Sequence, residues 1–116
     1  MISNSRIILV TGGARSGKSV LAERIAGQFD MPRIYIATAM AGDEEMSRRI
    51  ARHREMRGTG WQTVEESRDL GAALAATDGQ GVRLVDCLTL WLANLFEAHD
   101  ADTESARLCA ALAAQN

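Results

Sequence analysis

Short apolar runs alternate along the chain with segments in which apolar residues recur at helical spacings. The runs at 6–10, 33–38 and 82–86 predict strands, and the first of these is expected to be buried on both faces, as in a parallel sheet. Residues 61–65 form a weaker strand candidate. Strands that alternate with helices are typical of βαβ units. We therefore expect one α/β domain, residues 1–116, with a mostly parallel sheet flanked by helices.

Helical periodicity separates the expected strands. After the first run, Val20, Leu21, Ile25 and Phe29 lie at helical spacings and predict a helix with one apolar face. Four more helices are expected: from an Asp43 N-cap to Gly58, from a Ser67 N-cap to Ala76, at 88–98 and at 103–114.

The loop between the first run and the first helix contains a phosphate-binding motif. Gly12, Gly17, Lys18 and Ser19 satisfy the pattern G-x-x-x-x-G-K-S/T. Glycines let successive backbone N–H groups turn toward phosphate oxygens, and the following helix presents its positive end to the same anion. Lys18 would reach the β- and γ-phosphates, and the Ser19 hydroxyl would ligate Mg²⁺. We therefore expect a P-loop domain that binds GTP or ATP with Mg²⁺.

A carboxylate at the end of a neighbouring strand usually completes such a site. Asp86 ends the run 82–86 and would hold Mg²⁺ directly or through water. The alternative is an ordinary aspartate that caps the next helix. Glu65, which ends the weaker strand candidate, is a rival or an additional carboxylate.

The segment from 48 to 57 holds five arginines and His53. On a helix, Arg49, His53 and Arg57 share one face, because they are spaced by four residues. One interpretation is a solvated, charged helix with an incidental histidine. The other is a helix that grips phosphate and carries a nucleophilic imidazole, which nearby positive charge would keep neutral. His99, beside acidic residues, is expected to lie on the surface.

Composition narrows the function classes. The formal net charge of −2, with acidic and basic residues interleaved, argues against a general nucleic-acid-binding protein, which would be basic overall. The apolar runs are too short to span a membrane. Cys87 and Cys109 form neither a CxxC pair nor a metal-binding cluster. We expect both to be buried as small apolar residues in a reducing, cytoplasmic compartment.

Several of these segments resemble one known family. The stretch Ile8–Ser19 is similar to the opening of the bifunctional adenosylcobinamide kinase/adenosylcobinamide-phosphate guanylyltransferases, which act late in cobalamin biosynthesis. The resemblance covers most of the chain and fades after Phe96. The further matching segments, in order, are Tyr35–Thr38, Arg49–Arg54 followed by Trp61, and Leu84–Thr89.

The resemblance implies two reactions on nucleotide and corrinoid substrates. A nucleoside triphosphate phosphorylates adenosylcobinamide, and GTP then donates GMP to the product through a guanylylated histidine, which by position is His53. It also implies a RecA-like sheet and a homotrimer. The implied nucleotide contacts are Gly12, Gly13, Ala14, Arg15, Ser16, Gly17, Lys18 and Ser19, then Ala37, Thr38 and Ala39, then Arg54, Glu55, Met56 and Arg57, and the carboxylates Glu65 and Asp86.

Members of this family continue beyond the position of Asn116 with further strands and helices. The resemblance therefore implies an N-terminal portion that is incomplete at its C-terminus. Three alternatives stay open at this point. They are another small-molecule P-loop kinase without a covalent histidine, a nucleotide-dependent nucleic-acid-binding module whose arginine-rich helix grips phosphates, and a fragment that binds nucleotide without turnover.

Overall fold

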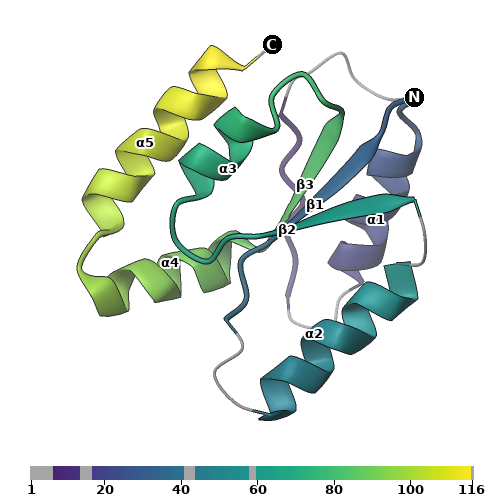
Figure 1. Ribbon diagram of the computed structural model, residues 1–116, viewed down its shortest axis with the longest axis horizontal. Helices are drawn as coiled ribbons and strands as arrows, with labels where there is room; N and C mark the ends of the chain where they lie inside the picture. Colours follow the sequence, from purple (N-terminus) through teal and green to yellow (C-terminus); the bar gives the residue numbers. More distant parts are fainter. Residues whose placement is uncertain (1–6, 14–16, 41–43, 58–59, 116) are drawn as a thin grey trace.

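Three parallel strands form the centre of the computed structural model, which describes residues 7–13, 17–40, 44–57 and 60–115 (Figure 1). The strands are β1 (Arg33–Ala37), β2 (Trp61–Glu65) and β3 (Val82–Asp86), in the order β2-β1-β3. Each pair of neighbours is parallel. The expected α/β class is confirmed, and the strands predicted at 33–38, 61–65 and 82–86 are present, with β1 ending at Ala37, one residue before its predicted limit.

The register of the sheet brings the strand ends to one edge. Ala37 pairs with Glu65 on one side and with Asp86 on the other. Successive side chains of a strand point to opposite faces, so Tyr35, Leu84 and Asp86 share one face of the sheet. The carboxyl ends of all three strands, and both predicted carboxylates, therefore lie along the same edge.

Three helices cover the opposite face of the sheet. They are α3 (Leu70–Ala76), α4 (Leu88–Ala98) and α5 (Ala101–Ala114), and they lie on one side of the strands in Figure 1. Trp91 and Leu95, one helical turn apart on α4, are buried there. The core formed in this layer consists of Ile34, Ile36, Leu70, Ala73, Leu74, Trp91 and Leu95.

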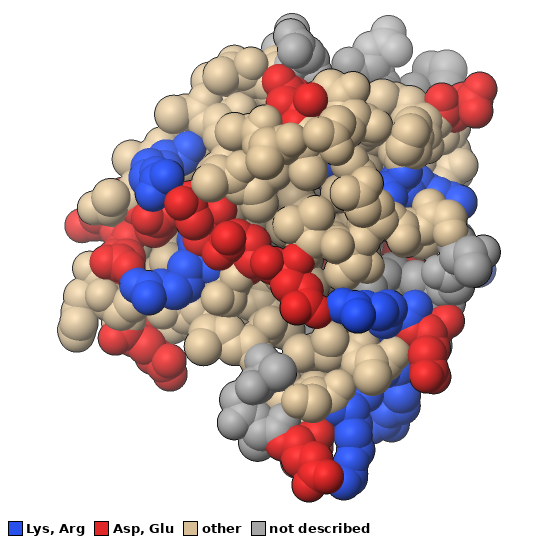
Figure 2. Space-filling view, in the orientation of Figure 1, with Lys and Arg blue, Asp and Glu red and all other residues tan. Residues whose placement is uncertain are grey.

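The helices α1 (Lys18–Gly27) and α2 (Glu44–Arg57) lie on the other side of the sheet. α2 carries Glu44 and Glu45 in its first turn, where negative charge favours the helix dipole, as expected. The expected cap Asp43 and stop Gly58 lie outside the described residues. Figure 2 shows Lys and Arg side chains, which on α2 are all arginines, gathered over this helix with acidic side chains among them. This surface therefore carries both signs of charge.

Two predicted helix starts need correction. Ser67 does not cap α3; Asp69 does, because its Oδ1 accepts a hydrogen bond from the Ala72 N–H at 3.1 Å. The preceding residues form a turn in which the Glu66 carboxylate accepts from the backbone N–H of Asp69 at 3.0 Å. α5 begins at Ala101, two residues before the predicted start.

The first apolar run is not the doubly buried strand that its composition predicts. Residues 7–10 belong to no strand of the described sheet, and the exposed fractions of Ile7 and Leu9 are 56% and 71%. Arg6 lies outside the described residues. This segment and β3 are separate walls of a largely apolar pocket of about 570 Å³. A buried strand needs hydrogen-bonded neighbours on both sides, and the described part of the chain supplies neither.

Other burial predictions are also corrected. Val20 and Leu21 on α1 are each 51% exposed, because the helix instead buries Ala26 and turns Ala22 and Ile25 toward the pocket. Cys109 is exposed and Cys87 is only half-buried. His99, which ends α4, is exposed, as predicted. None of the helices that the structure describes combines the length and the apolar character needed to cross a membrane.

At Gly71, α3 approaches the backbone of α5 closely. A Cβ there would lie 2.9 Å from the Arg107 carbonyl oxygen. We expect Gly71→Ala to lower the free energy of unfolding, because overpacking costs about 1–3 kcal/mol. That exceeds the roughly 1 kcal/mol of helix propensity that alanine recovers. Equilibrium urea unfolding measures the difference.

Gly27→Ala is the matched control for this experiment. Its Cβ would meet only the tip of the flexible Arg33 side chain, at 3.4 Å. This variant should unfold at the same urea concentration as the parent chain, or a higher one. Equal destabilisation by both substitutions would contradict the close approach of α3 to α5.

Candidate nucleotide-binding and catalytic site

The start of α1 is built to face an anion. Gly17 precedes the helix with φ of 85°, a left-handed conformation that glycine adopts without strain, and it offers no side chain to cap the first turn. Among the described residues no side chain caps that turn, and the helix dipole favours a negatively charged ligand there. Lys18 Nζ donates to the Gly13 carbonyl oxygen at 3.2 Å, so its ammonium lies over the loop.

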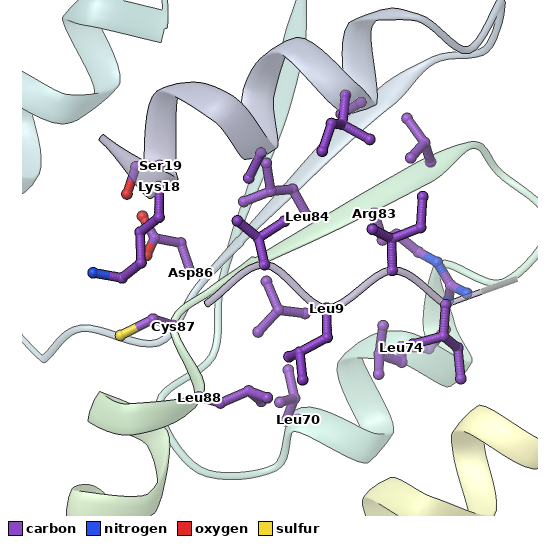
Figure 3. Close-up of a pocket in the computed structure, with 18 of the residues that line it drawn as sticks. Leu9, Lys18, Ser19, Leu70, Leu74, Arg83, Leu84, Asp86, Cys87 and Leu88 are labelled. Atoms are coloured by element: carbon purple, nitrogen blue, oxygen red, sulfur yellow. The ribbon is translucent and has the colours of Figure 1, made fainter. Parts of the chain in front are cut away.

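Asp86 lies at the same end of the large pocket. Figure 3 shows Lys18, Ser19 and Asp86 gathered there, with the Cys87 side chain beside them. α1 packs against β3, and Asp86 ends β3 on the face that α1 covers. One hydroxyl, one carboxylate and one ammonium therefore converge at the carboxyl edge of the sheet, next to the start of α1.

Thr38 joins the ends of β1 and β3. Its backbone N–H donates to the Asp86 carbonyl oxygen at 3.1 Å. Its hydroxyl donates to the Cys87 carbonyl oxygen at 2.7 Å and accepts from the Cys87 N–H at 2.8 Å. Thr38 is fully buried. The backbone on both sides of the Asp86 side chain is therefore held by one residue of the neighbouring strand.

Asn94 extends this connection to a third segment. Its Nδ2 donates to the Thr38 carbonyl oxygen at 2.9 Å and to the Ser67 carbonyl oxygen at 3.0 Å. The amide thus links α4 to the chain that follows β1 and to the chain that follows β2. The sequence offered no sign of this role, because a single asparagine in a helix is usually a surface residue.

The smaller pocket lies where α2 meets the end of β2. It has a volume of about 230 Å³ and is lined by Ala39, Ser47, Ile50, Ala51, Arg54 and Glu65. Arg54 Nη2 lies 2.6 Å from Glu65 Oε1 in an ion pair that holds the helix beside the strand end. Both side chains are more than half exposed, so the pair contributes little to stability. Three predicted nucleotide contacts, Ala39, Arg54 and Glu65, meet here.

Comparison with known families matches residues 8–116 to the family described as cobinamide kinase / cobinamide phosphate guanyltransferase. The chain belongs to this family. Three curated relatives carry the description bifunctional adenosylcobalamin biosynthesis protein. The Pseudomonas aeruginosa relative is 55% identical over 79% of this chain. Those of Escherichia coli and Salmonella typhimurium are 40% identical over 84% and 43% identical over 79% of it.

The matches cover 54%, 54% and 51% of these three relatives. The chain therefore spans about half the length of the curated relatives that it matches. Family membership is shown for almost the whole chain, while the activity of the complete relatives comes to this chain only as a proposal.

The structure describes only some of the other nucleotide contacts that the family resemblance implies. Gly12 and Gly13 are exposed in the loop before α1, Ala37 is half-buried at the end of β1, and Glu55 is exposed on α2. Ala14, Arg15 and Ser16 lie outside the described residues. The backbone of α2 includes positions 53, 56 and 57, but the side chains of His53, Met56 and Arg57 lie outside the description.

The donor set suits a metal ion that arrives with the nucleotide. Among the described residues, no group of three or more His, Cys, Asp or Glu side chains could hold a metal ion. Ser19 and Asp86 supply one hydroxyl and one carboxylate. This matches Mg²⁺, which proteins commonly bind through one or two carboxylates, with substrate phosphates and water as the remaining ligands.

Thr38 should matter more to stability than a typical buried threonine. Thr38→Val keeps the shape of the side chain but removes both hydrogen bonds to Cys87, and we expect it to cost about 1–3 kcal/mol of unfolding free energy. Thr77→Val is the matched control, since Thr77 is also buried but donates to Ala73 O, which already accepts a backbone N–H. Urea unfolding should show the larger loss for Thr38→Val. Similar losses of unfolding free energy would show that the hydrogen bonds between Thr38 and Cys87 contribute no more than those of Thr77.

Proposed function

We propose that this chain forms the nucleotide-binding part of a bifunctional cobinamide kinase and cobinamide phosphate guanylyltransferase. The kinase step transfers the γ-phosphoryl group of ATP or GTP to a cobinamide hydroxyl. The second step transfers GMP from GTP to the resulting phosphate. The observation that carries the proposal is the convergence of Lys18, Ser19 and Asp86 beside the start of α1, in a chain that belongs to this family.

Different residues of the chain bind different parts of the Mg²⁺–triphosphate. The first turn of α1 receives the phosphates, and Lys18 exchanges its contact with Gly13 O for phosphate oxygens. Ser19 and Asp86 would hold Mg²⁺, which when bound neutralises charge that develops on the phosphates. The corrinoid substrate and a homotrimeric assembly with a RecA-like sheet belong to this proposal as properties of the longer protein, which we expect in the cytoplasm.

His53 is the proposed nucleophile of guanylyl transfer. An imidazole nitrogen attacks the α-phosphorus of GTP, a P–N bond forms, the bond to the bridging oxygen breaks, and pyrophosphate leaves. A phosphate oxygen of cobinamide phosphate then attacks the same phosphorus and frees the imidazole. Support comes from α2, which carries position 53 and meets the carboxyl edge of the sheet at the Arg54–Glu65 pair.

Arginines of α2 would stabilise the charge of this second reaction. Arg49 and Arg52 are exposed on the helix, and Arg54 borders the smaller pocket. Fixed cations beside the α-phosphate and the leaving pyrophosphate lower the energy of the transition state. A kinase without a covalent histidine would have no need of an imidazole on this helix.

A labelling experiment tests the covalent step. The chain is incubated with Mg²⁺ and GTP labelled at the α-phosphate, denatured, and assayed for retained label. We expect an acid-labile, base-stable label that is lost in His53→Ala. His99→Asn is the matched control, because it removes the chain's other histidine, at an exposed helix end where asparagine tolerates the left-handed backbone.

The label should persist in His99→Asn. If the chain alone takes up no label, the assay is repeated on a fusion of residues 1–116 with the C-terminal half of the Pseudomonas aeruginosa relative. Label that survives His53→Ala would disprove the proposed nucleophile. Absence of label in both folded proteins would disprove guanylyl transfer and favour a P-loop kinase.

Nucleotide binding is tested separately through Lys18, the only lysine of the chain. We expect Lys18→Ala to weaken binding of Mg²⁺–GTP and Mg²⁺–ATP by about tenfold or more, because a charge-assisted hydrogen bond to phosphate contributes about 1.5–3 kcal/mol. Isothermal titration calorimetry measures the affinities. Arg24→Ala, which removes a positive charge from the last turn of the same helix, should leave them nearly unchanged. Equal losses of affinity in the two variants would show that Lys18 acts only through its positive charge and not through a direct contact with phosphate.

A further inference from the structure

Tyr35, the only tyrosine of the chain, is fixed beside Asp86. It is 6% exposed in β1. Its ring meets the Trp61 ring edge-on, with centroids 6.0 Å apart and an interplanar angle of 85°. The Arg33 guanidinium lies 5.4 Å from the centroid of the Trp61 ring on the same face of the sheet. The phenol is therefore packed in place by β2.

The hydroxyl of Tyr35 reaches the carboxylate across the strand pair. Tyr35 is level with Leu84 in the register, two residues before Asp86, and its side chain lies on the same face. Its hydroxyl donates a hydrogen bond to Asp86 Oδ2. A hydroxyl–carboxylate hydrogen bond is among the strong ones, because the acceptor is charged.

The backbone around Asp86 has little freedom of its own. Thr38 holds the Asp86 carbonyl oxygen and both polar backbone groups of Cys87. What remains to be set is the rotation of the carboxylate about its side-chain bonds. The contact with Tyr35 sets that rotation, and it engages one of the two carboxylate oxygens.

We infer that Tyr35 is a positioning residue that makes Asp86 a one-oxygen ligand and so favours Mg²⁺ over Ca²⁺ in the nucleotide complex. Mg²⁺ requires near-octahedral geometry and takes one oxygen from a carboxylate, whereas Ca²⁺ readily accepts both oxygens of one carboxylate. With Oδ2 engaged by the Tyr35 hydroxyl, Oδ1 would be the oxygen that ligates a metal ion. This inference rests on the proposed function, in which Asp86 is a metal ligand.

The test compares Tyr35→Phe with Asp86→Asn in the 116-residue chain. Tyr35→Phe removes only the hydroxyl and keeps the ring against Trp61. Affinity for a non-hydrolysable GTP analogue is measured by calorimetry with saturating Mg²⁺, with saturating Ca²⁺ and with EDTA. We expect Tyr35→Phe to reduce the preference for Mg²⁺ over Ca²⁺ by about three- to tenfold, mainly by tightening the Ca²⁺ complex, and to leave the affinity in EDTA unchanged.

A purely structural role for Tyr35 would lower all three affinities together, and that result would overturn the inference. An unchanged Mg²⁺/Ca²⁺ ratio in Tyr35→Phe, with metal dependence lost in Asp86→Asn, would also overturn it and leave the proposed function standing. Metal dependence that survives Asp86→Asn would refute the metal role of Asp86 itself, and the inference with it.

A second readout follows the Tyr35 side chain directly by NMR spectroscopy. A chain labelled with ¹³C at the tyrosine Cζ gives one tyrosine resonance, because Tyr35 is the only tyrosine. This resonance should shift when Mg²⁺ is added to the nucleotide complex, since the oxygen that accepts the hydroxyl belongs to the carboxylate that binds the metal ion. The added shift should vanish in Asp86→Asn. A resonance that ignores Mg²⁺ would overturn the inference.

Discussion

The candidate site depends on one constraint, the hydrogen bonding of Thr38 across the ends of β1 and β3. Parallel strands normally diverge once their ladder ends, and the residues that follow them lie in loops. Here a fully buried hydroxyl pairs with both polar backbone groups of Cys87, so the ladder is continued by a side chain past Asp86. A carboxylate on a loose loop would sample many orientations. Asp86 is instead the last residue of β3, the strand that α1 covers.

The two faces of the sheet have separate tasks. One face is packed by α3, α4 and α5 into the apolar core. The other face carries Tyr35, Leu84 and Asp86 beneath α1 and presents polar groups at its carboxyl edge. Because successive side chains of a strand point to opposite faces, alternate residues of β1 and β3 can serve the apolar core on one face and the candidate site on the other.

The sequence alone predicts the parts that depend on short-range pattern. The strands 61–65 and 82–86 and the helix 88–98 have the predicted limits, since turn-forming residues bound each apolar run. Residues 7–10 show the limit of such reasoning, because composition indicates burial but not which neighbours are present to provide it. Ser67 and Asp69 are both residue types that cap helices well. The structure uses Asp69, whose backbone N–H donates to the Glu66 carboxylate.

Some residues of the candidate site can be predicted from the sequence, and others cannot. The glycine-rich pattern predicts Lys18 and Ser19, the strand end predicts Asp86, and the structure places all three in one pocket. Tyr35 and Asn94 escape prediction, because their roles follow from strand register and from the place where α4 crosses the strand ends. Neither property is visible in local sequence. The residues proposed to contact a ligand are therefore visible in the sequence pattern, whereas the residues packed around them are not.

Asn94 has a consequence for how the molecule fluctuates. Its amide joins α4 to the segments that follow β1 and β2, so a motion that lifts α4 from the sheet also releases the backbone that orders the carboxyl edge. Opening of the helix and loss of the site then belong to one cooperative unit. A ligand that binds only the form in which α4 is packed on the sheet stabilises that packing by mass action, although it need not touch the helix. Slower amide exchange along α4 would accordingly report on occupancy of a site at the opposite face of the sheet.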